Sequence, residues 1–264
     1  MEGGGKQVLN PLAALGAYSI RSVREMGGMA LMFVRAICYS FLPPYRLRLI
    51  LKQMEFIGVK STIVVILTGL FSGMVLALQG YYGFRKFGGE SLLGATVALS
   101  LVRELGPVLT GLMVTARAGS AIAAEIGTMR VTEQIDALIA MGVNPIHYLV
   151  SPRLLAGILM VPLLTGLTDV VGIGGGYFVG VTLLKINSGV FVSKMRELVE
   201  LSDILNGLYK AFVFGGILTL VGCYKGYNAR RGAEGVGQAT TEAVVISSIS
   251  ILVGDYILTS LLFG

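Results

Sequence analysis

Long apolar stretches recur along this chain of 264 residues, and several approach the roughly 18–20 residues that a helix needs to cross a bilayer. Only 14% of the residues are charged, against about 25% in soluble domains, and the mean hydropathy is +0.78. The sequence therefore predicts an all-α polytopic membrane protein with a single domain over residues 1–264. We expect an N-terminal and interfacial segment at 1–52 and a five-helix transmembrane core at 53–264. The predicted spans cover residues 61–78, 92–124, 154–184, 211–224 and 243–263.

The segment before the first span has a mixed character, because three arginines (Arg21, Arg24 and Arg35) interrupt the apolar background of residues 11–42. An arginine at the centre of a spanning helix costs about 2.5–3.5 kcal/mol on insertion scales. We therefore expect one or two amphipathic helices that lie in the membrane interface. A sixth span is the alternative. The polar, glycine-containing residues 1–10 are expected to be loose.

Basic residues predict the orientation of the chain in the membrane. Eight lysines and arginines precede the first predicted span, and this bias favours a cytoplasmic N-terminus. Five spans then place the C-terminus at Gly264 on the opposite, outer side, which is the periplasm if the chain lies in a bacterial inner membrane. The net charge of +6 is explained by this topology, so we expect no nucleic-acid partner.

Small residues recur at four-residue spacing, which stacks them on one helix face and lets backbones approach closely. Packing within the chain is the simpler interpretation of these rows, and a dimer seam is the alternative for one of them. The rows are Gly69/Gly73, Gly119/Ala123/Gly127 and Gly172/Gly176/Gly180.

A charge pair, Arg103 and Glu104, lies inside the second predicted span. Charges at bilayer depth are costly, so both side chains should face a cavity, a partner or water. One interpretation is a polar opening in an apolar cavity, suited to the head group of an amphipathic ligand. The other is a structural ion pair with another helix, or a position near the outer interface. Asp169 is expected to be structural, and Asp255 is a candidate partner for a cation on a neighbouring span.

A short polar helix is predicted directly after the second span. Thr132 is a suitable N-cap, Glu133 and Asp136 would occupy the first turn, and Gly142 is placed to end the helix. About nine residues give roughly 13 Å, far too short to cross a membrane. Such a helix suits docking into a groove of a soluble partner, and an interfacial helix without a partner is the alternative. Its predicted apolar stripe consists of Ile135, Leu138 and Ile139.

Several chemistries are not encoded by recognisable motifs. The chain has no Gly-x-x-x-x-Gly-Lys-[Ser/Thr] loop, so we do not expect it to hydrolyse ATP by that route. His147 is the sole histidine, and Cys38 and Cys223 have no metal-ligand spacing. We therefore expect no catalytic residues, no metal and no cofactor.

The central part of the sequence closely resembles the MlaE family, the permease subunits of ABC transporters linked to MCE (mammalian cell entry) proteins. The resemblance covers about residues 51–264. The specific runs are RELGPVLTG at 103–111, ARAGSA at 116–121, AEIGTM at 124–129 and TEQIDAL at 132–138, with further matches at 151–153, 171–175, 226–227 and 239–241.

This resemblance implies a homodimer in the bacterial inner membrane, with one interfacial helix and five transmembrane helices per chain. Two copies of a cytoplasmic ABC ATPase would dock on the coupling helix, and an MCE-protein hexamer would sit on the periplasmic side. A small cytoplasmic STAS-domain subunit is a further candidate partner. The residues that this implies for ATPase coupling are Thr132, Glu133, Gln134, Ile135, Asp136 and Leu138.

The resemblance also implies a function, which is movement of phospholipid between the inner and outer membranes to maintain outer-membrane lipid asymmetry. The lipid pocket would lie at the dimer interface. Alternatives are a permease for another hydrophobic substrate, such as a sterol, and a structural membrane subunit that only anchors partners. The residues that this implies for substrate binding are Leu76, Gln79, Tyr82, Leu99, Arg103 and Glu104.

Overall fold

The computed structural model describes residues 11–43, 46–230 and 232–263, and every regular element in these ranges is a helix. The loose segment expected at residues 1–10 lies outside them. Five helical stretches in the described residues are long and apolar enough to cross a membrane. The fold class predicted from the sequence, an all-α polytopic membrane protein, is therefore confirmed. The five stretches are Leu47–Arg85, Glu90–Val131, Ile146–Leu183, Leu201–Tyr227 and Gly232–Leu262.

The first two spans are longer than the apolar runs that predicted them, because polar residues at their ends continue the helices beyond the apolar core. The second span is a continuous helix that contains two π-helical segments, η3 and η4. The first span comprises α2 (Leu47–Ile57), η1 (Val59–Ser61) and α3 (Thr62–Arg85). The second comprises η2 (Glu90–Leu92), α4 (Leu93–Ser100), η3 (Leu101–Leu105), α5 (Gly106–Val114), η4 (Thr115–Gly119) and α6 (Ser120–Val131).

Two short helices connect the later spans: α7 precedes the third span, and α9 lies between the third and the fourth. The fourth span begins ten residues before the predicted boundary of 211, because its first turns carry polar residues that the apolar pattern excluded. The elements are α7 (Gln134–Ala140), η5 (Ile146–Val150), α8 (Ser151–Tyr177), η6 (Phe178–Leu183), α9 (Ser188–Leu198), α10 (Leu201–Tyr227) and α11 (Gly232–Phe263).

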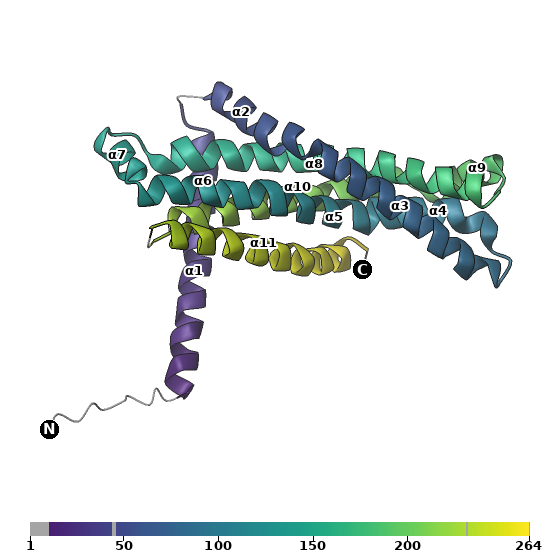
Figure 1. Cartoon of the computed structure of the whole chain (residues 1–264), viewed down its shortest axis with the longest axis horizontal. Helices are drawn as coiled ribbons and strands as arrows, with labels where there is room; N and C mark the ends of the chain where they lie inside the picture. Colours follow the sequence, from purple (N-terminus) through teal and green to yellow (C-terminus); the bar gives the residue numbers. More distant parts are fainter. Residues whose placement is uncertain (1–10, 44–45, 231, 264) are drawn as a thin grey trace.

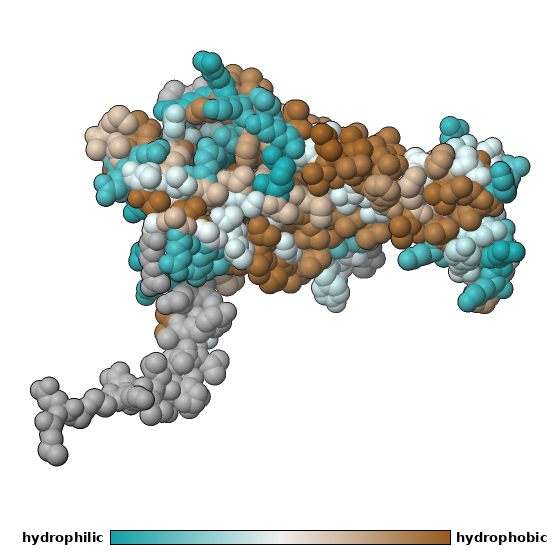
Figure 2. Space-filling view, in the orientation of Figure 1, coloured by the Kyte–Doolittle hydropathy of each residue, from teal (hydrophilic) through white to brown (hydrophobic). Residues whose placement is uncertain are grey.

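The spanning helices run side by side along the long axis of the molecule, with α7 at one end and α9 at the other (Figure 1). The space-filling view shows hydrophobic residues along the middle of the bundle and hydrophilic residues gathered at both ends (Figure 2). This distribution is the one that a bilayer imposes on a polytopic protein.

The N-terminal segment forms one helix, α1 (Pro11–Ser40), which lies across the direction of the spanning helices at the α7 end (Figure 1). It is not among the five stretches that are apolar enough to span. Its second half packs on the bundle: Met32 and Ala36 are buried, and the Ser151 hydroxyl donates to the Ala36 carbonyl at 2.9 Å. Apolar side chains on its other faces, including Val23 and Met26, are exposed.

Small residues allow α3 and α8 to pack with their backbones close together. A Cβ atom at Gly69 would lie 2.8 Å from the Thr168 carbonyl oxygen, and one at Gly73 would overlap the Gly172 carbonyl. In the same way, a Cβ atom at Gly226 of α10 would lie 2.7 Å from the carbonyl oxygen of Ala123. Members of all three predicted rows thus pack within the chain.

Candidate functional site

Arg103 and Glu104 lie in η3, the π-helical segment in the middle of the second span. Pro107 follows directly in the first turn of α5 and has no N–H to donate to the carbonyl of Arg103, four residues earlier. A π-helical turn also widens the helix locally and commonly marks functional positions. The sequence thus creates an irregular, partly unsatisfied helix segment at the charge pair.

Arg103 reaches across to the first turn of α10. Its Nε and Nη2 atoms each lie 2.7 Å from Oδ1 of Asp203, a carboxylate that is almost completely buried. The other carboxylate oxygen of Asp203 accepts the backbone N–H of Glu200 at 3.0 Å, which caps the start of α10. Asp203 therefore fixes the beginning of α10 and the Arg103 guanidinium at the same time.

Glu104 pairs with Lys210, whose side chain is fully buried between three helices. The Lys210 ammonium lies 2.7 Å from Glu104 Oε2 and 3.1 Å from Asp255 Oδ1 of α11. It also lies 2.7 Å from the Thr259 hydroxyl and donates to the Arg103 carbonyl at 3.0 Å. This group of residues, which we call the Lys210 network, ties the second, fourth and fifth spans together by charge-assisted hydrogen bonds.

The contacts of Arg103 and Glu104 bear on whether the two residues form structural ion pairs or face a ligand. Both Arg103 and Glu104 form ion pairs with another helix, and the predicted pairing of Asp255 with a cation on a neighbouring span is confirmed. Both side chains nevertheless stay about two-fifths exposed, Arg103 at 40% and Glu104 at 38%. A structural role and contact with a ligand are therefore compatible.

Sequence reasoning missed two members of the site, Asp203 and Lys210. Both lie just before residue 211, where the apolar pattern placed the start of the fourth span, and so they were counted outside the membrane. The available signal was their spacing: residues 203 and 210 are two helical turns apart, on the same face as the apolar run that follows.

An apolar hollow of about 470 Å³ lies beside the Lys210 network between α10 and α11. Two of its lining residues are sequence neighbours of network residues: Tyr209 precedes Lys210, and Leu258 precedes Thr259. A charged cluster next to an apolar hollow can hold the two parts of an amphipathic molecule. The lining residues are Leu205, Asn206, Tyr209, Leu258, Leu261 and Leu262.

The other residues predicted for substrate binding are placed elsewhere. Leu76 packs against the buried cluster of α3 and α4, Gln79 and Tyr82 are exposed on α3, and Leu99 is half-buried on α4. The helix α3 packs mainly on α8 and α4, whereas the charge pair points to α10 and α11. Within one chain, the α3 residues therefore do not lie in the same site as Arg103 and Glu104.

Asp169 of α8 is buried near the start of α5, facing Gly106. A Cβ atom at position 106 would overlap its carboxylate oxygen and would lie 2.8 Å from the Leu101 carbonyl oxygen, so a larger residue there would force Asp169 to move. Among the described residues, Oδ1 of Asp169 has no hydrogen-bond partner. Nearby, the hydroxyls of Thr110 and Thr168 bond to each other at 2.7 Å and complete a polar layer between α5 and α8.

The short helix after the second span is present as α7, but it begins differently from the prediction. The expectation that Thr132 caps it is wrong: α6 continues to Val131, so the Thr132 hydroxyl bonds back to the Thr128 carbonyl at 2.7 Å. The N-cap position is occupied by Glu133, which has a left-handed backbone with φ of 60°. The reversal of chain direction thus falls at Glu133, and the Gln134 amide donates to the Thr132 hydroxyl at 3.1 Å.

The end of α7 matches the prediction. Gly142 has a positive φ of 73°, and its N–H donates to the Ile139 carbonyl at 2.9 Å. The predicted apolar stripe is divided: Ile135 is completely buried and anchors α7, while Ile139 is 53% exposed. Beside it, Asp136 is held by an exposed ion pair with Arg130 at 2.7 Å. The helix thus presents a rigid, partly apolar surface at the end of the bundle (Figure 1).

Comparison with known proteins gives consistent matches over nearly the whole chain. A family model described as Permease MlaE matches residues 50–261. A probable ABC transporter permease protein of Rickettsia typhi is 48% identical over 256 residues, 97% of this chain and 99% of the relative. The intermembrane phospholipid transport system permease protein MlaE of Haemophilus influenzae is 43% identical over 258 residues, with the same coverage of both chains. The chloroplastic protein TRIGALACTOSYLDIACYLGLYCEROL 1 of Arabidopsis thaliana is 38% identical over 213 residues, 81% of this chain and 61% of the relative.

Five apolar helices, three of them joined by a partly exposed ionic network, together with relatives named as permeases, define a polytopic membrane protein of the permease class. The matched residues include nearly all of the five spans, the charge pair and α7. The chain belongs to the MlaE family of ABC transporter permeases. The resemblance on which the sequence prediction depended is thus confirmed, and the chain is a transport subunit rather than an enzyme.

Proposed function

We propose that this chain is the membrane permease of an ABC transporter that moves phospholipid between the inner and outer membranes and so maintains outer-membrane lipid asymmetry. The observation that carries the proposal is membership of the MlaE family, together with a Haemophilus influenzae relative whose name states intermembrane phospholipid transport. The Lys210 network and the adjoining apolar hollow are suited to such a substrate, because one offers charges to a head group and the other accepts an acyl chain.

The energy for transport would come from a separate cytoplasmic ABC ATPase in two copies. The surface that we assign to it is α7 and its flanks, Thr132–Leu138, where Ile135 fixes the helix and Ile139 remains exposed. Because α1 lies at the same end of the bundle as α7, the N-terminus and the ATPase would share the cytoplasmic side (Figure 1). The end of α11, and with it the C-terminus, would then be periplasmic.

The remaining partners follow from the same family assignment. A second copy of the chain would complete the lipid pocket and bring the α3 residues Leu76, Gln79 and Tyr82 toward the charge pair. An MCE-protein hexamer would dock at the α9 end, and a small STAS-domain subunit is a candidate on the cytoplasmic side. In this arrangement α1 lies in the cytoplasmic membrane interface.

Reconstitution tests this proposal directly. The chain is co-expressed with an ABC ATPase and a single-span MCE protein from the same genome, purified and placed in nanodiscs. We expect copurification of all three proteins and an ATPase rate that changes when phospholipid composition is varied. A complex that forms but neither carries phospholipid nor responds to it would contradict the assigned substrate.

A second candidate substrate is a different membrane lipid. The Arabidopsis thaliana relative carries the name of a glycolipid, trigalactosyldiacylglycerol. The names of the relatives therefore refer to more than one class of lipid. Mass spectrometry of the lipids retained by the purified complex distinguishes the candidates, because a glycolipid or sterol differs from a phospholipid in mass and in phosphorus content.

A further inference from the structure

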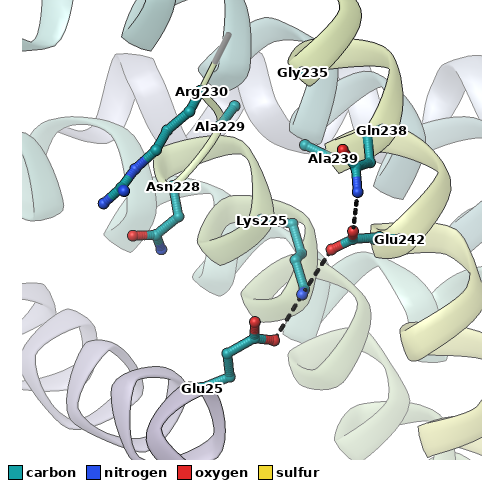
Figure 3. Close-up of a pocket in the computed structure, with 9 residues that line it drawn as sticks. All are labelled: Glu25, Lys225, Asn228, Ala229, Arg230, Gly235, Gln238, Ala239 and Glu242. Carbon is teal, nitrogen blue, oxygen red and sulfur yellow. Dashed lines mark hydrogen bonds and ion pairs between the residues drawn. The ribbon is translucent and has the colours of Figure 1, made fainter. Parts of the chain in front are cut away.

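A polar hollow, separate from the Lys210 network and from the apolar hollow beside it, lies where α1, α10 and α11 meet (Figure 3). Its volume is about 350 Å³, and it is found at the same end of the bundle as α7. Neither the charge pair nor the coupling helix contributes to it. The lining residues are Glu25, Lys225, Asn228, Ala229, Arg230, Gly235, Gln238, Ala239 and Glu242.

One side of the hollow carries a net negative charge. The Lys225 ammonium, only 7% exposed as a residue, lies 2.8 Å from Glu25 Oε2 of α1 and 2.9 Å from Glu242 Oε2 of α11. The Gln238 amide donates to the other oxygen of Glu242 at 3.0 Å. Two carboxylates thus share one ammonium, and this side has one negative charge in excess.

The opposite side carries a positive charge. Figure 3 shows Arg230 and Asn228 across the hollow from the ion-paired residues. Arg230 is exposed, and the ion pairs found among the described residues do not include it. Its backbone is held against the first turn of α11, because the carbonyl of Arg230 occupies the space that a Cβ atom at Gly235 would need. The turn between α10 and α11 therefore holds the backbone of Arg230 beside the hollow, and its exposed guanidinium is within the lining.

A second, apolar hollow lies farther along α1. The helix α1 crosses α10 where Gly28 packs against the Tyr224 ring. Beyond this crossing, toward the middle of the bundle, a second hollow of about 300 Å³ is lined almost entirely by apolar residues, including Phe33, Phe212 and Leu220. Polar and apolar hollows on either side of an amphipathic crossing helix correspond to the head-group and acyl layers of one leaflet.

We propose that the hollow of Figure 3 binds the phosphoethanolamine group of a membrane phospholipid. The phosphate would pair with Arg230 and with the second N–H of the Asn228 side-chain amide, whose first N–H donates to the Tyr224 carbonyl at 2.8 Å. The primary ammonium would pair with Glu25 and Glu242. A lipid with an anionic head group and no ammonium would leave the carboxylate side unmatched. A choline head group has a positive charge but no N–H to donate to the carboxylates. The site depends on membrane insertion of the chain and not on the proposed transport function.

Native mass spectrometry of the full-length protein tests the site. The protein carries Arg103→Ala, so that lipid at the Lys210 network does not contribute, and is purified with equal amounts of phosphatidylethanolamine, phosphatidylglycerol and phosphatidylcholine. We expect retained phosphatidylethanolamine to exceed each of the others by about tenfold, the ratio that 1.4 kcal/mol gives. Arg230→Gln should remove most of the retained lipid, and Glu25→Gln should remove the preference over phosphatidylglycerol.

The control is Lys194→Gln, which removes an exposed lysine of α9 at the far end of the bundle and should leave lipid retention unchanged. Arg230 is exposed, so its variant should fold normally even if loss of the Glu25 ion pair destabilises α1. Displacement of the lipid by excess soluble glycerophosphoethanolamine would support the site but assign its ligand to a soluble source. Equal retention of the three lipids, or unchanged retention in Arg230→Gln, would overturn the proposal.

Discussion

The ammonium of Lys210 and the carboxylate of Glu104 lie 2.7 Å apart, although the lysine belongs to α10 and the glutamate to a π-helical segment 106 residues earlier. The same ammonium donates to the Arg103 carbonyl, four residues before Pro107. The Arg103 carbonyl cannot accept a helical hydrogen bond from Pro107, which has no N–H, and it accepts one from Lys210 instead. This relationship fixes the position of the charge pair in the bundle.

Replacing Lys210 by methionine should strongly destabilise the protein. The substitution preserves much of the side-chain volume but leaves Glu104 and Asp255 facing each other without a cation. Removing one partner of a buried ion pair costs about 3–5 kcal/mol, so we expect a clear fall in Tm of the purified protein in detergent. Adding Glu104→Gln and Asp255→Asn should restore part of the loss. A Lys210→Met variant with an unchanged Tm would contradict the structural role of the network.

Replacing Arg103 by alanine should reduce the phospholipid bound to the purified complex. Its guanidinium is 40% exposed and can pair with a phosphate while it contacts Asp203. The loss of one charge-assisted contact corresponds to about a tenfold weaker retention. Phosphorus analysis and mass spectrometry provide the measurement, and Arg103→Lys, which keeps the charge beside Asp203, is the matched control. Undiminished lipid in Arg103→Ala would remove Arg103 from the substrate site.

Replacing Gly73 by alanine should disturb the packing of α3 on α8, because its methyl group would overlap the Gly172 carbonyl. Overpacking of this kind costs about 1–3 kcal/mol. Gly83→Ala on the same helix is the control: a Cβ atom there meets nothing within 4 Å, and alanine favours a helix over glycine by roughly 1 kcal/mol. Thermal unfolding should therefore give a lower Tm for the first variant and an unchanged or higher Tm for the second. Equal values would mean that the two helices do not pack as described.

Replacing Glu133 by lysine should weaken docking of the ATPase without unfolding the membrane part. The side chain is exposed at the turn that precedes α7, and the change reverses one charge of the proposed contact surface. We expect the amount of copurified ATPase to fall severalfold, as for a reversed charge at an interface. Glu197→Lys on α9, at the opposite end, should leave the amount of copurified ATPase unchanged. An unchanged yield of complex for Glu133→Lys would count against α7 as the coupling helix.

Local chemistry explains why part of α7 could be predicted from the sequence and part could not. Gly142 ends α7 with a positive φ, as its position after an apolar stripe indicated. The beginning was placed wrongly, because Thr132 has the same propensity to cap a helix start as to bond back to its own preceding turn. Which of the two occurs depends on how far α6 extends, and α6 extends to Val131 because it packs along α10 and α11.

The sequence by itself determined the fold class, the five spans and the family, because hydropathy and helix period act over a few neighbouring residues. It also showed that the charges at 103 and 104 needed partners. Only the tertiary structure decided that those partners are Asp203 and Lys210, that Lys210 also pairs with Asp255, and that Glu25 of α1 reaches Lys225. Ion pairs between helices depend on how the helices pack and rotate against each other, and residues separated by 100 to 200 positions carry no local pattern that records this.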